Sequence, residues 1–270
     1  MTHISEDVFR GDRVTLRRRN DTSNRFLGVN DAAVSAWAAS VEIQGLDRVL
    51  RFEWKRGAEA PDDSDPKDRG TLAGTRVWVS VVPLVDALLA SYAGLLQNGT
   101  KVIELGAGLG VPAMVCAALG ARTWITDVPG LLDLLEWNAD LNFSSTSRQH
   151  ISCTLPAASR EAYPVSVHVA ALDWESVEAA EALTVEAGGF DLIICCDCVY
   201  APLYGDSWKL MLQCIDTLCG RCTEVVLAVE HRCDGDGITA FLQELGGQFG
   251  KVDRVRRVDI GVSDIEVIVA

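Results

Sequence analysis

A glycine-rich segment at residues 102–110 has the composition of a ligand-binding turn. It reads Val-Ile-Glu-Leu-Gly-Ala-Gly-Leu-Gly, a β-branched strand that enters a turn, and a segment of helical character follows at once. Glycines let the backbone approach a ligand closely, and the first turn of a helix presents unpaired N–H groups. The segment therefore predicts a nucleotide-type pocket at the carboxyl end of a parallel strand.

The spacing of these glycines argues against two common nucleotide ligands. The dinucleotide fingerprint needs a third glycine three positions after the second, where this chain has Val111, and Gly110 comes one position early. A P-loop needs a lysine after the turn, and none follows. We therefore expect neither NAD nor a hydrolysed nucleoside triphosphate at this site.

Two acidic residues indicate which ligand the pocket holds instead. Asp127 ends the next predicted strand, where a carboxylate can accept hydrogen bonds from ribose hydroxyls. A carboxylate at Glu104, beside the turn, suits the ammonium and sulfonium groups of S-adenosylmethionine better than a pyrophosphate. Glu104 could also bond N–H groups of the loop, which is compatible with binding. Together these residues favour S-adenosylmethionine as the cofactor.

The elements that must position these residues alternate between strands and helices. The pattern predicts strands at 101–105, 122–126, 165–171, 190–196 and 224–229 and helices at 84–96, 110–119, 129–141, 203–218 and 237–245. Two late strands, 252–258 and 265–269, are close enough in sequence to form an antiparallel pair. This alternation predicts an α/β fold with a mainly parallel sheet and right-handed crossovers.

The first 70 residues form an N-terminal extension in our interpretation, ahead of a main domain at 71–270. Alternating residues at 49–55 predict a strand, and we expect a β-hairpin in this extension. Residues 31–41 favour a small helix, and the basic triplet at 17–19 favours a solvated tail. The segment 57–70 predicts a flexible acidic loop, and 143–163 an irregular insertion.

Charge and cysteine content limit the class of protein. The formal net charge of −14 argues against nucleic acid as a partner, since phosphate binding needs a basic surface. The odd number of cysteines, nine, and the polar first residues favour reduced thiols inside the cell. No apolar run is long enough to span a bilayer, and neither the cysteines nor the histidines have metal-site spacing. We expect a cytoplasmic protein, or one also present in the nucleus, without metal.

Five short motifs occur in a fixed order along the chain. They are Val77-Trp78, Glu104-Leu-Gly-Ala-Gly-Leu-Gly, Ile125-Thr-Asp127, Leu172-Asp-Trp174 and Cys196-Asp-Cys-Val-Tyr200. The set resembles the seven-strand, class I protein-lysine methyltransferases with an Asp-x-x-Tyr signature, which modify non-histone proteins. The resemblance covers about residues 72–270. Within that span, the similarity is greatest to members that modify an AAA ATPase, and it is carried by residues 131–142, 230–232 and 263–268.

The resemblance implies a Rossmann-like fold and a set of cofactor-binding residues. The implied sheet has seven mostly parallel strands, helices on both faces and an antiparallel C-terminal strand pair. The implied S-adenosylmethionine site comprises Trp78, Glu104, Gly106, Ala107, Gly108, Asp127, Trp174 and Cys196. Trp174 can cover the adenine, Trp78 can wall the methionine side, and the small Cys196 lets adenine approach the backbone. Core packing of the two tryptophans and a helix-capping role for Asp127 remain open.

The same resemblance assigns the acceptor site to Asp197 and Tyr200. Both follow the apolar strand at 190–196, at the end where α/β sheets place their sites. A carboxylate can orient a lysine amine, and an aromatic face can accommodate its cation. Asp197 could instead cap the helix near Pro202, with Tyr200 in the core. Glu230 and Arg232 either shape the substrate channel or form an ordinary surface ion pair.

The resemblance implies that the partner is a protein modified on a lysine side chain. Family members act on AAA ATPases, chaperones and elongation factors, so the substrate does not follow from the sequence. We expect a monomeric S-adenosylmethionine-dependent methyltransferase. A small-molecule methyltransferase on the same fold is the alternative, since fold does not fix the substrate, and a non-catalytic cofactor-binding module is a third reading.

Overall fold

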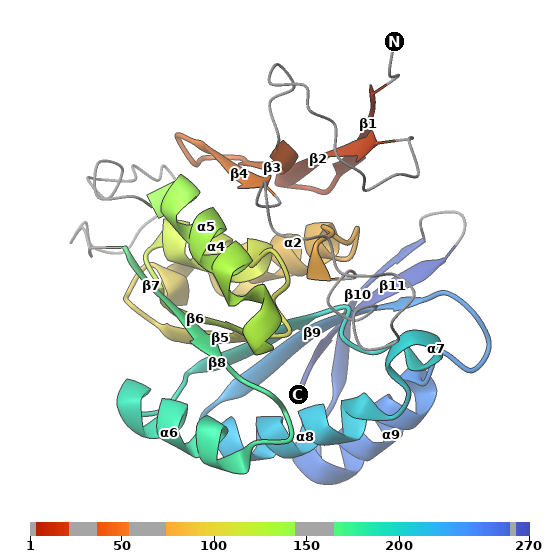
Figure 1. Ribbon diagram of the computed structural model, residues 1–270. Helices are drawn as coiled ribbons and strands as arrows, with labels where there is room; N and C mark the ends of the chain where they lie inside the picture. The colour runs from red at the N-terminus through yellow and green to blue at the C-terminus, as the bar shows by residue number, and fades with distance from the viewer. Residues whose placement is uncertain (1–3, 22–36, 54–73, 144–164, 260–262) are drawn as a thin grey trace.

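The computed structural model describes residues 4–21, 37–53, 74–143, 165–259 and 263–270, which form two sheets and their covering helices (Figure 1). The larger sheet has the order β10-β11-β9-β8-β5-β6-β7. Its strands are β5 (Lys101–Leu105), β6 (Arg122–Asp127), β7 (Ser166–Ala171), β8 (Leu192–Cys196), β9 (Glu224–His231), β10 (Asp253–Asp259) and β11 (Asp264–Val269). Strands β5 to β9 pair in parallel, whereas β11 runs antiparallel to β9 and β10. The mostly parallel, seven-stranded sheet with an antiparallel C-terminal pair is confirmed.

Helices cover both faces of this sheet (Figure 1). One face carries α2 (Val81–Ser91), α3 (Ala93–Leu96), α4 (Val111–Leu119) and α5 (Leu132–Phe143), and the other α6 (Val177–Ala187), α8 (Ser207–Leu218) and α9 (Ile238–Phe249). Successive residues of the central strands enter opposite cores: Val102 packs with α2 and α4, and Ile103 with α6 and α8. Burial on both faces explains why β8, which lies between β5 and β9, is continuously apolar in sequence.

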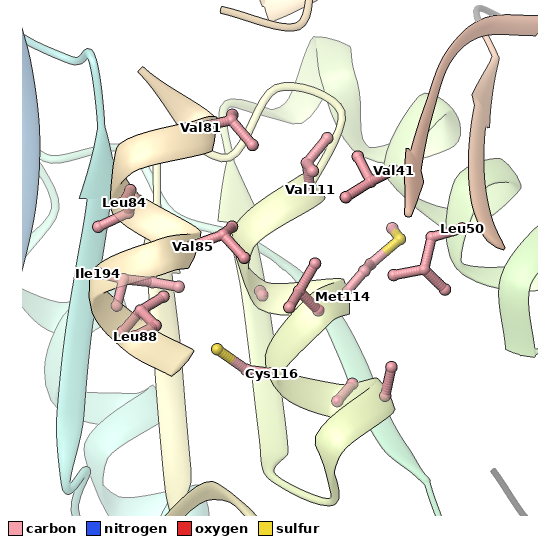
Figure 2. Packing of buried hydrophobic residues seen from close by; sticks show 14 of the residues in the cluster. Val41, Leu50, Val81, Leu84, Val85, Leu88, Val111, Met114, Cys116 and Ile194 are labelled. Carbon is pink, nitrogen blue, oxygen red and sulfur yellow. The ribbon is translucent and has the colours of Figure 1, made fainter. Parts of the chain in front are cut away.

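A four-stranded antiparallel meander precedes the larger sheet. It consists of β1 (Ile4–Arg10), β2 (Val14–Asp21), β3 (Trp37–Ile43) and β4 (Val49–Glu53), paired in chain order. Its buried face joins the core of α2 and α4, and Figure 2 shows Met114 of α4 pointing toward Val41 and Leu50. The extension therefore shares its core with the larger sheet, and it contains a meander where the sequence predicted a single hairpin.

Helix side chains hold both ends of this meander. Asp86 of α2 is 2% exposed and accepts hydrogen bonds from the backbone N–H groups of Asp12 (2.7 Å) and Arg13 (2.9 Å). At the other end, Asn142 of α5 accepts from the N–H of Arg51 (2.9 Å) and donates to the carbonyl of the same residue (2.7 Å). One turn earlier on α5, Asn138 makes the same pair of contacts with the backbone of Glu53. The two asparagines thus make the backbone hydrogen bonds that a neighbouring strand would otherwise make with β4.

Two expectations for the N-terminal region are wrong. The small helix expected at 31–41 is contradicted where the structure describes this segment, because residues 37–41 belong to β3, which pairs with β2 and β4. The basic triplet at 17–19 is part of β2 rather than a solvated tail. Arg18 donates to the carbonyl of Val77 (3.2 Å) and pairs with Asp7 (3.3 Å). Pairing with neighbouring strands determines the structure of both segments, and the local propensities of a single sequence do not reveal this pairing.

The remaining elements differ from the predictions mainly in their boundaries. The predicted helix at 84–96 is divided into α2 and α3, and the one at 203–218 into α7 (Ala201–Tyr204) and α8, separated by Gly205 at φ 58°. Helix α6 was not predicted. The acidic loop at 57–70, the insertion at 143–163 after its first residue, and the boundary at residue 70 lie outside the described residues.

Two general features of the described chain bear on its class. None of its helices is long and apolar enough to cross a membrane. The eight cysteines within the described ranges are free thiols.

Candidate active site

The glycine-rich turn lies between β5 and α4, where three backbone conformations favour glycine. Gly106, Gly108 and Gly110 have φ values of 59°, 55° and 75°. A Cβ on Gly106 would lie 2.9 Å from Sγ of Cys198, and one on Gly108 would lie 2.7 Å from the carbonyl oxygen of Gly74. Gly106 and Gly108 are therefore packed so closely against neighbouring residues that neither position has room for a side chain.

Asp127, at the end of β6, holds the turn by hydrogen bonds. Its Oδ2 accepts from the N–H of Gly108 (2.8 Å), and its Oδ1 accepts from the N–H of Val128 (2.7 Å). Burial raises the pKa of this carboxyl above its ordinary value, although both hydrogen bonds oppose the shift. Each carboxylate oxygen has a second acceptor position, so the predicted bonds to ribose hydroxyls are compatible with this geometry.

Glu104 lies beneath the turn rather than in an open pocket. Its side chain is 1% exposed, and its Oε2 accepts a hydrogen bond from the N–H of Ala113 in the first turn of α4 (2.9 Å). Burial raises the pKa of Glu104 to about 8, and the nearby charge of Asp127 adds to the shift. A carboxyl with this pKa is mostly protonated at pH 7. Glu104 thus supports the turn and α4, and a direct contact with the cofactor stays a prediction.

Trp174 and two cysteines complete the surroundings of the turn. Cζ2 of Trp174 lies 3.1 Å from the Cβ position of Gly106, so the indole lies directly beside the turn. Cys198 donates to the carbonyl of Leu105 (3.4 Å), a contact that the sequence analysis missed. Cys196 ends β8 one position beyond the pairing of β8 with β5. A glycine-rich turn that contacts both an indole, Trp174, and a carboxylate, Asp127, fits a nucleoside-type cofactor such as S-adenosylmethionine.

Asp197 follows β8 in a conformation that side chains rarely adopt. Among the residues that the structure describes, it is the one non-glycine with a positive φ, 60°. The residue is 6% exposed, and its backbone N–H donates to the carbonyl of Ala228 in β9 (2.8 Å). A positive φ costs about 1–3 kcal/mol and persists only where the surroundings impose it, typically at functional sites. In this conformation Asp197 lies at the carboxyl end of β8, beside β9.

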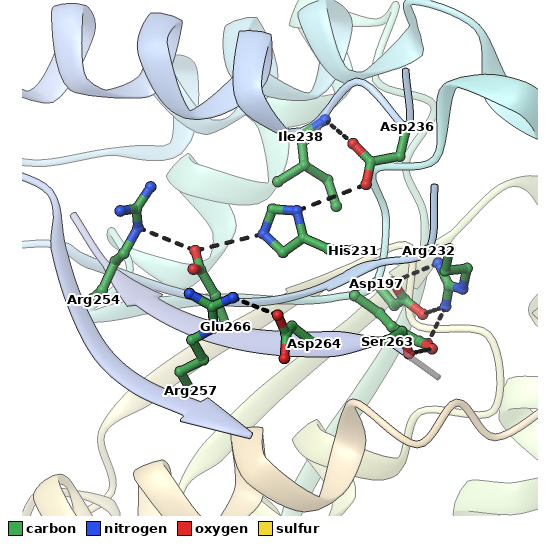
Figure 3. Close-up of polar contacts among 11 residues, drawn as sticks. Asp197, His231, Arg232, Asp236, Ile238, Arg254, Arg257, Ser263, Asp264 and Glu266 are labelled. Atoms are coloured by element: carbon green, nitrogen blue, oxygen red, sulfur yellow. Dashed lines mark hydrogen bonds and ion pairs between the residues drawn. The ribbon is translucent and has the colours of Figure 1, made fainter. Parts of the chain in front are cut away.

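One cation, Arg232, contacts both predicted acceptor residues, Asp197 and Tyr200. Its guanidinium bonds both carboxylate oxygens of Asp197, with 3.1 Å to Oδ1, and donates to Oε2 of Glu230 (2.6 Å). It also lies over two rings, 4.9 Å from the centroid of Trp78 and 5.2 Å from that of Tyr200. Figure 3 shows Arg232 and Asp197 facing each other at the ends of neighbouring strands. Burial raises the pKa of Asp197 above its ordinary value, and Arg232 opposes the shift.

The structure separates the predicted residues into two neighbouring groups. Gly106, Ala107, Gly108, Asp127 and Trp174 surround the turn, whereas Trp78 lies with Asp197 and Tyr200 around the guanidinium. The two groups adjoin because β8 pairs with both β5 and β9.

Four polar residues near Asp197 were missed by the sequence analysis or left open by it. Ser263 donates to Oε1 of Glu230 (2.6 Å), and its position ahead of β11 gave no sequence signal. Glu230 and Arg232 do form an ion pair, but it is largely buried, because Glu230 is 7% exposed, and Arg232 also bonds Asp197. Their role in a substrate channel stays a prediction. His231, which showed no partner in the sequence, lies 3.7 Å from Asp236 and 3.6 Å from Glu266 (Figure 3). The described residues contain no cluster of metal-ligating side chains.

Comparison with known proteins identifies relatives of this arrangement. The chain is similar to the EEF1A lysine methyltransferase 3 of Xenopus tropicalis, with 26% identity over 59% of each protein. It is 34% identical to the protein N-terminal and lysine N-methyltransferase efm7 of Emericella nidulans, over 53% of this chain and 52% of that protein. It is 32% identical to the protein N-lysine methyltransferase METTL21A of Danio rerio, over 64% of this chain and 67% of that protein.

These matches span between 52% and 67% of the relatives' own lengths. A family model described as lysine methyltransferase matches residues 66–248, which is more than half of the chain and includes the turn, Asp127, Trp174, Asp197, Tyr200 and Arg232. The chain belongs to the lysine methyltransferase family.

Proposed function

We propose that this protein transfers a methyl group from S-adenosylmethionine to the ε-amino nitrogen of a lysine in a non-histone protein. One observation carries the proposal: a buried carboxylate, Asp197, and two aromatic faces converge on one cation beside the glycine-rich turn. A seat that holds a guanidinium in this way suits a lysine ammonium, which prefers the same partners. Family membership and the names of the relatives support the same reaction.

The cofactor side of the proposed site is formed by the first group of residues. Gly106 and Gly108 would present backbone to the cofactor, Trp174 would cover the adenine, and Asp127 would accept hydrogen bonds from the ribose. S-adenosylmethionine supplies an electrophilic methyl group on a sulfonium. Glu104, which is mostly protonated at neutral pH, would contribute little negative charge beside that sulfonium.

The acceptor side prepares the amine for attack. An unperturbed lysine has a pKa of about 10.4 and is protonated at pH 7. Removal from water disfavours the ammonium form, whereas the carboxylate of Asp197 favours it. The lysine therefore binds as an ammonium ion and loses one proton to solvent before attack, and Asp197 orients the neutral nitrogen. The nitrogen lone pair then forms the new N–C bond while the C–S bond breaks, which leaves a thioether. The methylated nitrogen releases its extra proton to water. The protein contributes mainly alignment and desolvation.

The acceptor protein is a narrower proposal. One relative is named for EEF1A, so an elongation factor is a candidate, and the sequence resemblance adds AAA ATPases and chaperones. A second relative is also named as an N-terminal methyltransferase, which makes an α-amine the second candidate acceptor. We propose the cytoplasm as the place of the reaction, in accord with the sequence analysis.

Product analysis tests this function. The protein is incubated with methyl-labelled S-adenosylmethionine and a cell lysate, and the labelled fraction is hydrolysed and analysed by mass spectrometry. We expect label in a protein band and in ε-N-methyl-lysine. Label in an α-N-methyl residue would establish the N-terminal acceptor, and label confined to low-mass compounds would establish a small-molecule methyltransferase. Calorimetric binding of S-adenosylmethionine without any label would establish a non-catalytic module.

A further inference from the structure

The guanidinium of Arg232 is enclosed by the groups that the proposed function assigns to the acceptor. Its side chain is 19% exposed, it bonds Asp197 and Glu230, and it lies over the rings of Trp78 and Tyr200. Carboxylates on one side and π faces on the other are the partners that an ammonium ion prefers. The chain's own cation therefore lies where the proposed acceptor cation has to bind.

We propose that Arg232 occupies the acceptor seat when no acceptor is bound, and that its side chain leaves Asp197 when the acceptor lysine enters. This inference rests on the proposed function and assigns a gate to its acceptor site. A guanidinium carries no removable proton at neutral pH and lacks a free lone pair. Arg232 consequently fills the seat without becoming a substrate itself.

The arrangement of the two carboxylates makes this exchange feasible. Nη2 of Arg232 donates both to Asp197 and to Oε2 of Glu230, so the guanidinium can release Asp197 and keep Glu230. Glu230 is itself held by Ser263 (2.6 Å), which fixes the second carboxylate beside β11. The lysine enters as an ammonium ion and replaces one cation at Asp197 by another. The exchange itself therefore leaves no buried carboxylate unpaired, an outcome that is strongly disfavoured.

The position of Arg232 in the chain permits its side chain to move outward. It is the first residue after β9, and the next three residues, 233–235, are exposed. The side chain is long and is held by contacts at its guanidinium end. Release of those contacts therefore requires no change in the sheet.

A permanent ion pair that orients Asp197 is the competing account, and the two make opposite predictions. If Arg232 only positions Asp197, then Arg232→Ala weakens binding of an amine at the seat. If Arg232 competes for the seat, then the same change strengthens amine binding, because the apparent affinity no longer includes displacement of the guanidinium. Amine binding can be measured without methyl transfer, which separates this inference from the proposed function.

The experiment measures binding of Nα-acetyl-lysine amide by calorimetry, with the cofactor site saturated by S-adenosylhomocysteine. We expect Arg232→Ala to bind this probe about tenfold more tightly than the unchanged protein. Lys209→Ala is the matched control, since Lys209 also pairs with a carboxylate, Asp206, and lies over a ring, Trp208, outside the site. The control is expected to bind as the unchanged protein does. Equal or weaker binding by Arg232→Ala would overturn the inference.

A second variant guards against loss of folding. If Arg232→Ala unfolds, Arg232→Gln removes the charge, retains a hydrogen-bond donor, and is expected to change probe binding in the same direction. If the Arg232 variants bind the probe more tightly but the unchanged protein labels no substrate, the cation seat is retained and the methyltransferase function is rejected. Labelling of lysine by the unchanged protein, without tighter probe binding in either variant, would retain the function and reject the gate.

Discussion

At the scale of single residues, Gly108 and its neighbours fix the conformation of the glycine-rich turn. Gly108 combines a φ of 55° with a carbonyl oxygen 2.7 Å from its Cβ position, and the same residue donates its N–H to Asp127. Neither feature depends on a bound ligand. The turn is therefore preorganised, and the cofactor does not have to order it on binding.

Gly108→Ala is expected to reduce both stability and cofactor affinity. The methyl group meets backbone at Gly74 and the backbone must leave its preferred conformation, so we expect a loss of about 1–3 kcal/mol in unfolding free energy. Urea unfolding and calorimetry with S-adenosylhomocysteine measure the two effects. Gly189→Ala is the control, because Gly189 has a φ of 84° with open space around its Cβ position. We expect that variant to bind the cofactor normally, and equal cofactor affinity in both variants would contradict the packing argument.

At the scale of elements, α5 replaces a strand along the edge of the N-terminal sheet. Asn138 and Asn142 are one helical turn apart, about 6 Å, and they match backbone groups of Glu53 and Arg51, two residues apart on β4, about 7 Å. The helix thereby satisfies strand groups that face away from β3. The contact also ties the meander to the helix that follows Asp127.

Asn142→Ala is expected to weaken this junction. The substitution leaves the N–H and carbonyl of Arg51 without their partner, at a cost of about 1–3 kcal/mol. Thermal unfolding of the variant measures the loss, and Asp140→Ala, an exposed change on the same helix, is the control. An Asn142→Ala protein as stable as the Asp140→Ala control would show that the asparagine pairs are not stabilising.

The elements of the larger sheet were predictable because each has a strong local signal. β8 and β9 contain apolar runs of strand length, β5 and β6 are rich in β-branched residues, and Gly110 and Gly120 mark the two ends of α4. Helix α6 was missed because glutamates and alanines surround its few buried residues, Ala180, Leu183 and Ala187. Strand β3 was mistaken for a helix because its short alanine-containing segment is extended only through pairing with β2 and β4.

The sequence predicts which strand ends form the site, but it does not predict which side chains contact one another there. Trp78 and Arg232 are 154 positions apart in the sequence, and no local pattern indicates that the guanidinium lies over the indole. Ser263 reaches Glu230 only because β11 is antiparallel to β9. These contacts depend on topology, which brings the ends of distant strands to one edge of the sheet.

At the scale of the whole molecule, a mostly protonated carboxyl lies at the centre of the fold. Glu104 is on β5, which pairs with the central strand β8, and its pKa is about 8 against 4.5 for an exposed glutamate. The folded state thus binds a proton that the unfolded chain has lost between these pH values. Stability from this group is fully present below pH 4.5 and is lost as pH rises to about 8, because the unfolding free energy falls wherever the native state binds more protons.

Glu104→Gln is expected to remove that part of the pH dependence. The amide keeps an oxygen acceptor for Ala113 and does not titrate. The difference in unfolding free energy between variant and unchanged protein should shift in favour of the variant as pH rises from 5 to 8, by ~1.4 kcal/mol for each unit of pKa difference. Urea unfolding across this range measures the shift. Parallel pH profiles for the two proteins would contradict the raised pKa.

The central claim is that Asp197 serves the acceptor in methyl transfer, and Asp197→Asn tests it most directly. Asparagine tolerates a positive φ, so the change removes charge and leaves the strained conformation intact. The measurement is the rate of methyl transfer to the acceptor protein at saturating S-adenosylmethionine, with S-adenosylhomocysteine affinity measured by calorimetry. We predict a rate at least ~10²-fold lower with unchanged affinity, and methyl transfer at the original rate would contradict the account.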